Sequence, residues 1–317
     1  MGAVRRRHPD APTPWIDLST GINPRPYPVG TVPREAWSRL PSHEAEQALL
    51  EAAATRYGGD AGAIVAAPGT QALIQILPRL VGRSKVAIVG PTYGEHELCW
   101  RSHDHEVAVV PTLADAAGAD VVVVVNPDNP TGRLIAPRDL HAVKARLLVV
   151  DEAFIDFDPA DASLAGHLPE NAVVLRSFGK TYGLAGLRLG FALAPPPLVA
   201  RLRDTLGPWA VSGPALEIGR RALADQAWLQ ATADRLRVDG RKTDALLVAA
   251  GFTLAGGTSL FRLVRHEQAP LMVERLARRG IHVRAFADRP TSLRFGLPAG
   301  EADFGRLAIA LQVPQKV

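Results

Sequence analysis

Short apolar runs rich in β-branched residues recur along the chain and alternate with longer helical patterns. Such alternation is typical of a mostly parallel sheet with helices on both faces. Each run is too short to cross a bilayer, including the five consecutive valines at 121–125. The runs predict seven strands at 63–67, 85–89, 106–110, 120–125, 146–150, 172–176 and 189–193.

The last third of the chain has a different organisation. Helical patterns follow Pro195-Pro196-Pro197 up to about residue 250, and the strand patterns at 252–264, 281–285 and 292–295 precede a last helix from Glu301. This arrangement predicts a smaller α+β domain. We expect an amino-terminal segment, 1–45, that packs with the small domain, a large domain at 46–215 and a small carboxyl-terminal domain at 216–317.

Composition excludes several classes of protein. A chain of 317 residues with 47% apolar residues can form a large core. The net charge is only +4 and the arginines are scattered, so we expect no nucleic-acid partner. The single cysteine, Cys99, excludes an intrachain disulfide, and no Cys and His spacing indicates a metal site. Without a signal peptide or membrane-spanning run, the chain is expected to be cytoplasmic.

Lys180 stands out because lysine is scarce in a chain that uses arginine almost everywhere else. A lysine can lose its proton and form a Schiff base with a carbonyl cofactor, whereas arginine cannot. An isolated lysine beside a glycine-rich turn would be an ordinary surface residue. Here Asn129, Asp151 and Arg188 accompany it, and each motif follows an apolar run, so each should lie at the carboxyl end of a strand. Ligands of open α/β sheets bind at that edge.

With these motifs in this order, the chain resembles the fold-type I enzymes that use pyridoxal 5'-phosphate (PLP), within the branch of histidinol-phosphate aminotransferase. The resemblance covers nearly the whole chain. It implies an aspartate aminotransferase-like fold, with a seven-stranded large domain and a smaller α+β domain. The segment Asp17-Leu18-Ser19-Thr20-Gly21-Ile22-Asn23-Pro24 is most similar to the threonine-phosphate decarboxylases of cobalamin biosynthesis.

The resemblance implies a task for each motif residue. Lys180 would hold the cofactor, Asp151 would pair with the pyridine nitrogen and Asn129 would bond the phenolic oxygen, while Tyr93 would stack on the ring. Phosphate ligands would be Gly69, Thr70, Gln71, Ser177, Arg188 and, from the partner subunit of a homodimer, Tyr57. For Pro68-Gly69-Thr70-Gln71, a position between a strand and a helix supports this role, although an ordinary turn and cap explains it equally well. Tyr57 could instead be a core aromatic, and Asp151 a helix cap or salt-bridge partner.

Phe154 departs from the aminotransferase pattern. Many relatives carry a tyrosine three residues after the pyridine-binding aspartate, and its hydroxyl donates to the phenolic oxygen. Loss of that donor would raise the basicity of the lysine-cofactor linkage, and it puts ordinary transamination in doubt. A tolerated apolar substitution beside the ring is the alternative. Arg294 matches the family's carboxylate-binding arginine, with Arg284 and Arg262 as weaker candidates, and Asn23 and Gly21 are the other expected substrate contacts.

Three functions are consistent with these residues. The first is decarboxylation of L-threonine O-3-phosphate to (R)-1-amino-2-propanol O-2-phosphate, a precursor in cobalamin biosynthesis. The second is an aminotransferase acting on histidinol phosphate or a similar amino acid. The third is a PLP-binding module of a transcription regulator, which is disfavoured because no DNA-binding domain precedes Trp15. A small phosphorylated amino acid is therefore the expected substrate, without a membrane partner.

Overall fold

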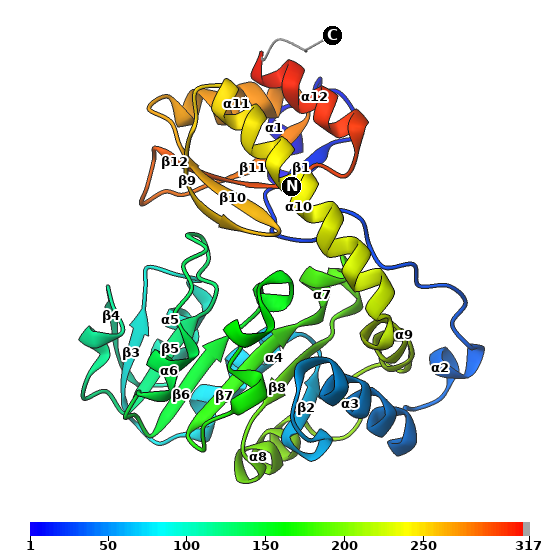
Figure 1. Cartoon of the computed structure of the whole chain (residues 1–317), viewed down its shortest axis with the longest axis vertical. Helices are drawn as coiled ribbons and strands as arrows, with labels where there is room; N and C mark the ends of the chain where they lie inside the picture. Colours follow the sequence, from blue (N-terminus) through cyan, green and yellow to red (C-terminus); the bar gives the residue numbers. More distant parts are fainter. Residues whose placement is uncertain (313–317) are drawn as a thin grey trace. The chain divides into compact units, whose positions relative to one another are not determined.

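The computed structural model describes residues 1–312, which divide into two compact units. The larger unit contains Tyr27–Asn129 and Arg133–Trp228. The smaller unit contains Met1–Pro26, Pro130–Gly132 and the described residues from Leu229 onward. Each unit has its own sheet (Figure 1). The domain boundaries expected at residues 45 and 215 stay a prediction, and residues 313–317 of the expected small domain lie outside the described part.

The larger unit is built on a seven-stranded sheet with the order β2-β8-β7-β6-β5-β3-β4. Only β8 runs against its neighbours, since it pairs antiparallel with both β2 and β7. The predicted fold class, an α/β fold with a mostly parallel seven-stranded sheet, is confirmed. The strands are β2 (Ile64–Ala67), β3 (Lys85–Val89), β4 (Glu106–Val110), β5 (Val121–Val125), β6 (Leu147–Asp151), β7 (Ala172–Ser177) and β8 (Gly190–Leu193).

The register of the central strands brings chemically active residues to one edge. Val125, the last residue of β5, pairs with Asp151, the last residue of β6. Asp151 pairs in turn with Leu175 of β7, two residues before Ser177. All three strands are buried at every position, as expected for a sheet that is covered on both faces. The carboxyl ends of these strands therefore form one continuous edge.

The ends of helices in the larger unit are determined by capping residues as well as by packing. In α3, Ser42 caps the start by accepting a hydrogen bond from the Ala45 N–H at 3.2 Å, and Gly58 ends the helix at a φ of +90°. The α-helices are α2 (Arg34–Ser38), α3 (His43–Tyr57), α4 (Thr70–Ile76), α5 (Glu95–Arg101), α6 (Pro137–His141), α7 (Phe178–Thr181), α8 (Pro196–Leu206) and α9 (Gly213–Ala224). Single turns of 3-10 helix are η1 (Ala61–Ala63), η2 (Leu77–Leu80), η3 (Ala114–Ala116), η4 (Ile155–Phe157), η5 (Ala160–Ala162), η6 (Ala165–His167) and η7 (Ala185–Leu187).

The smaller unit has a five-stranded sheet with the order β1-β11-β12-β10-β9. The amino-terminal strand β1 pairs parallel with β11, and the other pairs are antiparallel. Strands are β1 (Ile16–Leu18), β9 (Thr253–Thr258), β10 (Phe261–Arg265), β11 (Ile281–Ala285) and β12 (Ser292–Gly296). Helices are α1 (Gly2–Arg7), α10 (Gln226–Ala249), which begins in the larger unit, α11 (Ala269–Arg278) and α12 (Glu301–Leu311).

Two apolar cores correspond to the two units. The core of the larger unit surrounds Trp100 and the central valines, and that of the smaller unit surrounds Phe252, Phe295 and Leu307. Among the described residues, no helix combines the length and apolar composition needed to cross a bilayer.

Candidate functional site

Lys180 lies in α7, a single helical turn that begins directly after β7. Its side chain is half-buried, and its Nζ lies 5.0 Å from the centre of the Phe154 ring. Phe178, the first residue of the turn, and Tyr182, directly after its end, stack with ring centres 4.3 Å apart. The amine of Lys180 is therefore presented at the carboxyl edge of the sheet, against an apolar ring.

Asp151, the last residue of β6, is only 3% exposed. Its Oδ2 lies 3.0 Å from Nε2 of His96, a buried residue of α5, and its Oδ1 accepts a hydrogen bond from the Ala153 N–H at 3.1 Å. Burial alone would raise the pKa of Asp151, but the hydrogen bond and charge of His96, with Lys180 nearby, hold that pKa below its usual value. The carboxylate is thus ionised and able to pair with a cationic group.

Gly69 and Arg188 form a small cradle with basic and hydroxyl groups. Gly69 has a φ of +83°, and a Cβ at this position would lie 2.6 Å from a guanidinium nitrogen of Arg188. Likewise, a Cβ on Gly190 would lie 2.5 Å from the backbone nitrogen of Thr70, and Gly190 pairs with Ser177 across β7 and β8. Arg188 adopts the left-handed conformation with a φ of 56°, which is uncommon for a residue with a side chain. The geometry therefore gathers a cation, a hydroxyl and a backbone N–H, which suits an anion.

Gln71 and Tyr93 are connected by hydrogen bonds. The Gln71 amide donates to Glu95 Oε2 at 2.8 Å and accepts from the Tyr93 hydroxyl at 3.3 Å. The Tyr93 ring meets the His96 ring edge-on at 6.2 Å, and 39% of Tyr93 is exposed. Burial of the remainder, followed by the charge of Glu95, raises the pKa of the phenol. Tyr93 thus presents an open ring surface beside the Asp151 and His96 pair.

Asn129 lies within the loop that connects β5 to α6. Its carbonyl accepts a hydrogen bond from the Thr92 hydroxyl at 3.4 Å. The loop is closed upstream by Asn126, whose side chain donates to the Ile135 carbonyl at 3.1 Å and accepts from the Ile135 N–H at 2.8 Å. The Asn126 contacts fix the path of the chain that leads to Asn129.

Tyr57 lies inside the larger unit, with only 6% of its surface exposed. Its ring is 4.4 Å from the Arg176 guanidinium carbon and meets Phe191 edge-on at 5.6 Å. Burial raises the pKa of its phenol well above the usual value. No described residue hydrogen-bonds its hydroxyl. Its expected reach to a partner subunit stays a prediction.

The expected substrate contacts lie in the smaller unit. Arg294 of β12 pairs across the sheet with Arg284 of β11, and it donates to the Ser19 carbonyl at 2.7 Å. Burial and then the charge of Arg284 lower the pKa of Arg294 to about 10. Asn23 is buried, and its side-chain oxygen accepts from the Arg235 guanidinium at 3.0 Å. Gly21 is buried in the same amino-terminal segment.

The larger unit therefore brings together most of the predicted cofactor residues at one strand edge. Two residues of this site, His96 and Glu95, were not predicted from the sequence; they bond Asp151 and Gln71. A signal was present: His96 shares an otherwise apolar helix face with Cys99 and Trp100, three and four residues further on. A histidine at such a position requires a buried polar partner.

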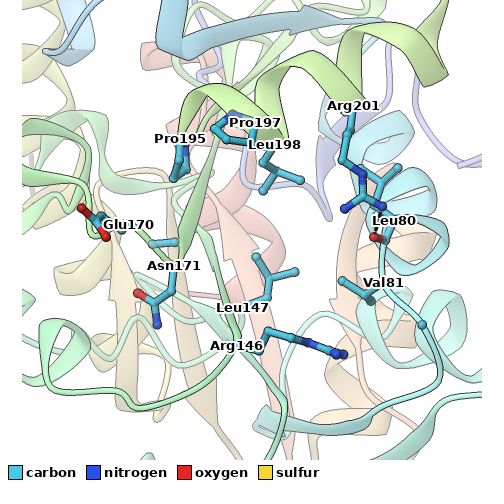
Figure 2. A pocket seen from close by; sticks show the side chains of 12 residues that line it. Leu80, Val81, Arg146, Leu147, Glu170, Asn171, Pro195, Pro197, Leu198 and Arg201 are labelled. Carbon is cyan, nitrogen blue, oxygen red and sulfur yellow. Dashed lines mark hydrogen bonds between the residues drawn. The ribbon is translucent and has the colours of Figure 1, made fainter.

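A cavity of about 440 Å³ lies at the opposite, amino-terminal ends of β6 and β7 (Figure 2). Its lining includes Leu147 and Ala172, the first residues of those strands, and two arginines. Arg146 donates to the Ser84 hydroxyl, and Arg201 donates to the Leu80 carbonyl. Both guanidinium groups are thus hydrogen-bonded to the protein itself. We place the candidate active site at the other edge of the sheet, around Lys180.

Known proteins resemble this chain in sequence and in fold. The model of the family described as aminotransferase class I and II matches residues 34–304. A threonine-phosphate decarboxylase from Sinorhizobium sp is 46% identical, with 96% of this chain and 94% of that protein covered. Another from Pseudomonas aeruginosa is 42% identical, with 94% and 91% covered. The solved histidinol-phosphate aminotransferase of Sinorhizobium meliloti, in complex with pyridoxal-5'-phosphate, has a TM-score of 0.84 at 23% identity and covers 98% of this chain and 92% of its own.

Proposed function

Because the chain belongs to the aminotransferase class I and II family, we propose that it is a PLP-dependent lyase that decarboxylates L-threonine O-3-phosphate. The products are (R)-1-amino-2-propanol O-2-phosphate and carbon dioxide, and the reaction belongs to cobalamin biosynthesis. The observation that carries the proposal is the 46% identity to a threonine-phosphate decarboxylase over 96% of this chain.

The residues of the larger unit fit the cofactor. The absent Cβ of Gly69 leaves room for the Arg188 guanidinium, which would bind the phosphate with Ser177 and the backbone of Thr70 and Gln71. Asp151, ionised and fixed by His96, would pair with the pyridine nitrogen. Tyr93 would cover the ring and Asn129 would bond its phenolic oxygen. The phosphate, the ring nitrogen, the ring face and the phenolic oxygen of PLP would therefore each have a candidate partner at one edge of the sheet.

Lys180 carries the proposed chemistry of the chain itself. PLP, when bound, withdraws the electron pair of the bond that breaks at the substrate α-carbon. In decarboxylation that bond joins the α-carbon to the carboxylate carbon, so carbon dioxide leaves and the electron pair stays behind. Lys180 Nζ, or a water, then delivers a proton to the α-carbon. Phe154, buried beside Nζ, supplies no hydroxyl to this region, unlike the tyrosine expected in an aminotransferase.

Arg294 is proposed to bind the substrate carboxylate, because it is a mostly buried cation with a second arginine opposite. Two adjacent guanidinium groups repel each other unless anions neutralise them. A phosphorylated amino acid brings two anionic groups, a carboxylate and a phosphate. We assign the carboxylate to Arg294 and the phosphate to Arg284, with Asn23 and Gly21 shaping the same segment.

The proposal includes a cytoplasmic homodimer in which Tyr57 contributes to the partner's phosphate site. Support for the compartment comes from Cys99, a buried thiol without a disulfide. Equilibrium sedimentation tests the dimer. Cofactor affinity of a Tyr57→Phe variant tests the hydroxyl, which has no hydrogen-bond acceptor or donor among the described residues of its own chain.

The experiment that tests the function supplies purified protein with PLP and L-threonine O-3-phosphate, without any 2-oxo acid. Sustained, stoichiometric release of carbon dioxide and aminopropanol phosphate is expected. Lys180→Ala should abolish both this release and the cofactor absorbance at about 420 nm that a lysine linkage gives. Full activity in that variant would refute the proposed role of Lys180.

The second candidate is an aminotransferase acting on histidinol phosphate or a similar amino acid. It is favoured by one observation, the fold likeness to a histidinol-phosphate aminotransferase with a TM-score of 0.84. This activity requires a 2-oxo acid as amino acceptor. No carbon dioxide release, with amino transfer once 2-oxoglutarate and histidinol phosphate are supplied, would establish the second candidate.

A further inference from the structure

A cluster of buried charges lies next to the Lys180 turn. We define the Asp156 cluster as Arg56, Glu152, Asp156, Arg176 and Thr181. The Arg176 guanidinium lies 3.1 Å from Glu152 Oε2 and also bonds Asp156, while Arg56 lies 3.3 Å from Asp156. The side chains of Glu152, Asp156 and Arg176 are each no more than 4% exposed. Two carboxylates and two guanidinium groups thus balance in charge within the unit.

Asp156 is the carboxylate of this cluster that is hydrogen-bonded to Thr181 of α7. Its Oδ2 accepts a hydrogen bond from the Thr181 hydroxyl, while its Oδ1 accepts from Arg176 and Arg56. Burial would raise the pKa of Asp156, but Arg176 and Arg56 hold that pKa below its usual value. The carboxylate is therefore ionised and accepts all of these bonds at neutral pH.

The α7 turn depends on such contacts for its position. It contains four residues, and a helix of one turn has almost no stability of its own. Phe178 and Tyr182 anchor its apolar side, and Tyr182 stacks on Trp228 with ring centres 5.5 Å apart. On the polar side, the hydrogen bond that the hydroxyl of Thr181, the residue next to Lys180, donates to Asp156 ties the turn to the cluster.

We propose that Asp156 is a positioning residue for Lys180, acting through the Thr181 hydroxyl. The carboxylate, held by Arg56 and Arg176, fixes the rotamer of Thr181 and the backbone of α7. The direction of the Lys180 side chain is set as a result. This inference rests on the proposed function in so far as Lys180 is the residue that binds the cofactor.

Thr181→Val is the first test, because valine keeps the β-branched shape and removes only the hydroxyl. Apoenzyme is mixed with PLP, and the rise of the absorbance band at about 420 nm is followed by stopped flow. We expect the band to form about tenfold more slowly than in wild type, because a displaced amine reacts less often in the right geometry. The kcat should fall by a similar factor, with KM within about twofold.

Two further variants separate positioning from a general loss of stability. Thr181→Ser keeps the hydroxyl and should restore band formation to within about twofold of wild type. Ser163→Ala removes a half-buried hydroxyl at the other end of the cluster, which donates to Glu152 at 2.6 Å and accepts from Arg176 and the Ala165 N–H but makes no hydrogen bond to α7. It should lower the thermal midpoint as much as Thr181→Val does, but leave the rate of band formation unchanged.

These measurements separate a failure of the proposed function from a failure of the positioning role of Asp156. If wild type forms no band with PLP, or Lys180→Ala retains it, the proposed function itself is wrong. If wild type forms the band and Thr181→Val matches its rate, only the positioning role is refuted. The same conclusion follows if Thr181→Ser is as slow as Thr181→Val, or if Ser163→Ala is equally slow.

Discussion

His96 Nε2 lies 3.0 Å from Asp151 Oδ2, and both residues are almost completely buried. Since a carboxylate only accepts hydrogen bonds when ionised, Nε2 carries the proton of this pair. The contact joins the first turn of α5 to the last residue of β6. It provides the hydrogen bond that an ionised carboxylate needs at a buried strand end.

His96→Gln should weaken PLP binding about tenfold, because an outer partner that orients a ligand typically has an effect of this size. The pKa of Asp151 is held down in the wild type, so its ionised form is lost only as the pH falls well below neutrality. Without His96 that pKa rises, and affinity for PLP should decline at a higher pH than in wild type. Fluorescence titration with PLP between pH 5 and 8, roughly the range in which proteins are most stable, measures both effects.

A matched control is His105→Gln. His105 is also buried, but its Nε2 bonds the Pro78 carbonyl at 3.0 Å, away from Asp151. This variant should lose stability without changing the affinity for PLP. Equal loss of PLP affinity in both variants would mean that His96 acts only through stability.

Strand positions could be predicted from the sequence because apolar, β-branched runs are a local signal. The run at 85–89 coincides with β3, and the run at 106–110 coincides with β4. The run at 146–150 is displaced by one residue, since β6 extends through Asp151. A buried aspartate in a strand departs from the apolar pattern, and its hydrogen bonds to His96 and to the Ala153 N–H account for it.

Side-chain partners between distant segments could not be predicted in the same way. The Arg56, Arg176 and Asp156 contacts join residues that are 20 to 100 positions apart. No periodic pattern links such residues, because the contacts depend on how the loop after β6 folds back on the sheet. Arg188 is a similar case, since its left-handed backbone is not indicated by its residue type.

Phe154→Tyr would introduce a hydroxyl near Lys180, whose Nζ lies 5.0 Å from the Phe154 ring centre. If the hydroxyl donates to the phenolic oxygen of PLP, it stabilises the negative charge there and favours the deprotonated lysine linkage. The pKa of that linkage should fall by about one unit. Absorbance of the holoenzyme as a function of pH measures it, and Phe157→Tyr, in the neighbouring 3-10 turn, is the control.

Arg294→Gln and Arg284→Gln should affect different parts of the substrate. Loss of Arg294 should raise KM for L-threonine O-3-phosphate at least about tenfold, because the proposed charge-assisted contact with the substrate carboxylate is removed. Loss of Arg284 should reduce the preference for phosphorylated over unphosphorylated threonine and weaken inhibition by inorganic phosphate. PLP affinity should be unchanged in both.

Arg265→Gln is the control for these arginines, since Arg265 is an exposed residue of the neighbouring strand β10. Its kinetics should match wild type. If either substrate-site variant loses PLP instead, the arginine concerned has been assigned to the wrong ligand.

Asp158→Asn should stabilise the protein above pH 6. Burial, followed by the charge of Asp156, raises the pKa of Asp158 from 3.8 to about 6. A carboxyl group with a raised pKa contributes its full stability below pH 3.8, and this contribution is lost as the pH rises through about 6. At pH 7.5 the variant should therefore exceed wild type by about 1 kcal/mol in unfolding free energy, after discounting for solvent screening. Urea denaturation at about pH 7.5 and 5.5 should show that this advantage shrinks at the lower pH, as Asp158 of the wild type takes up its proton.

The control is Asp161→Asn, because Asp161 is an exposed carboxylate three residues away. This variant should show no such pH dependence. An advantage that is the same at both pH values would instead indicate that the asparagine stabilises by packing and that the charge of Asp158 costs nothing.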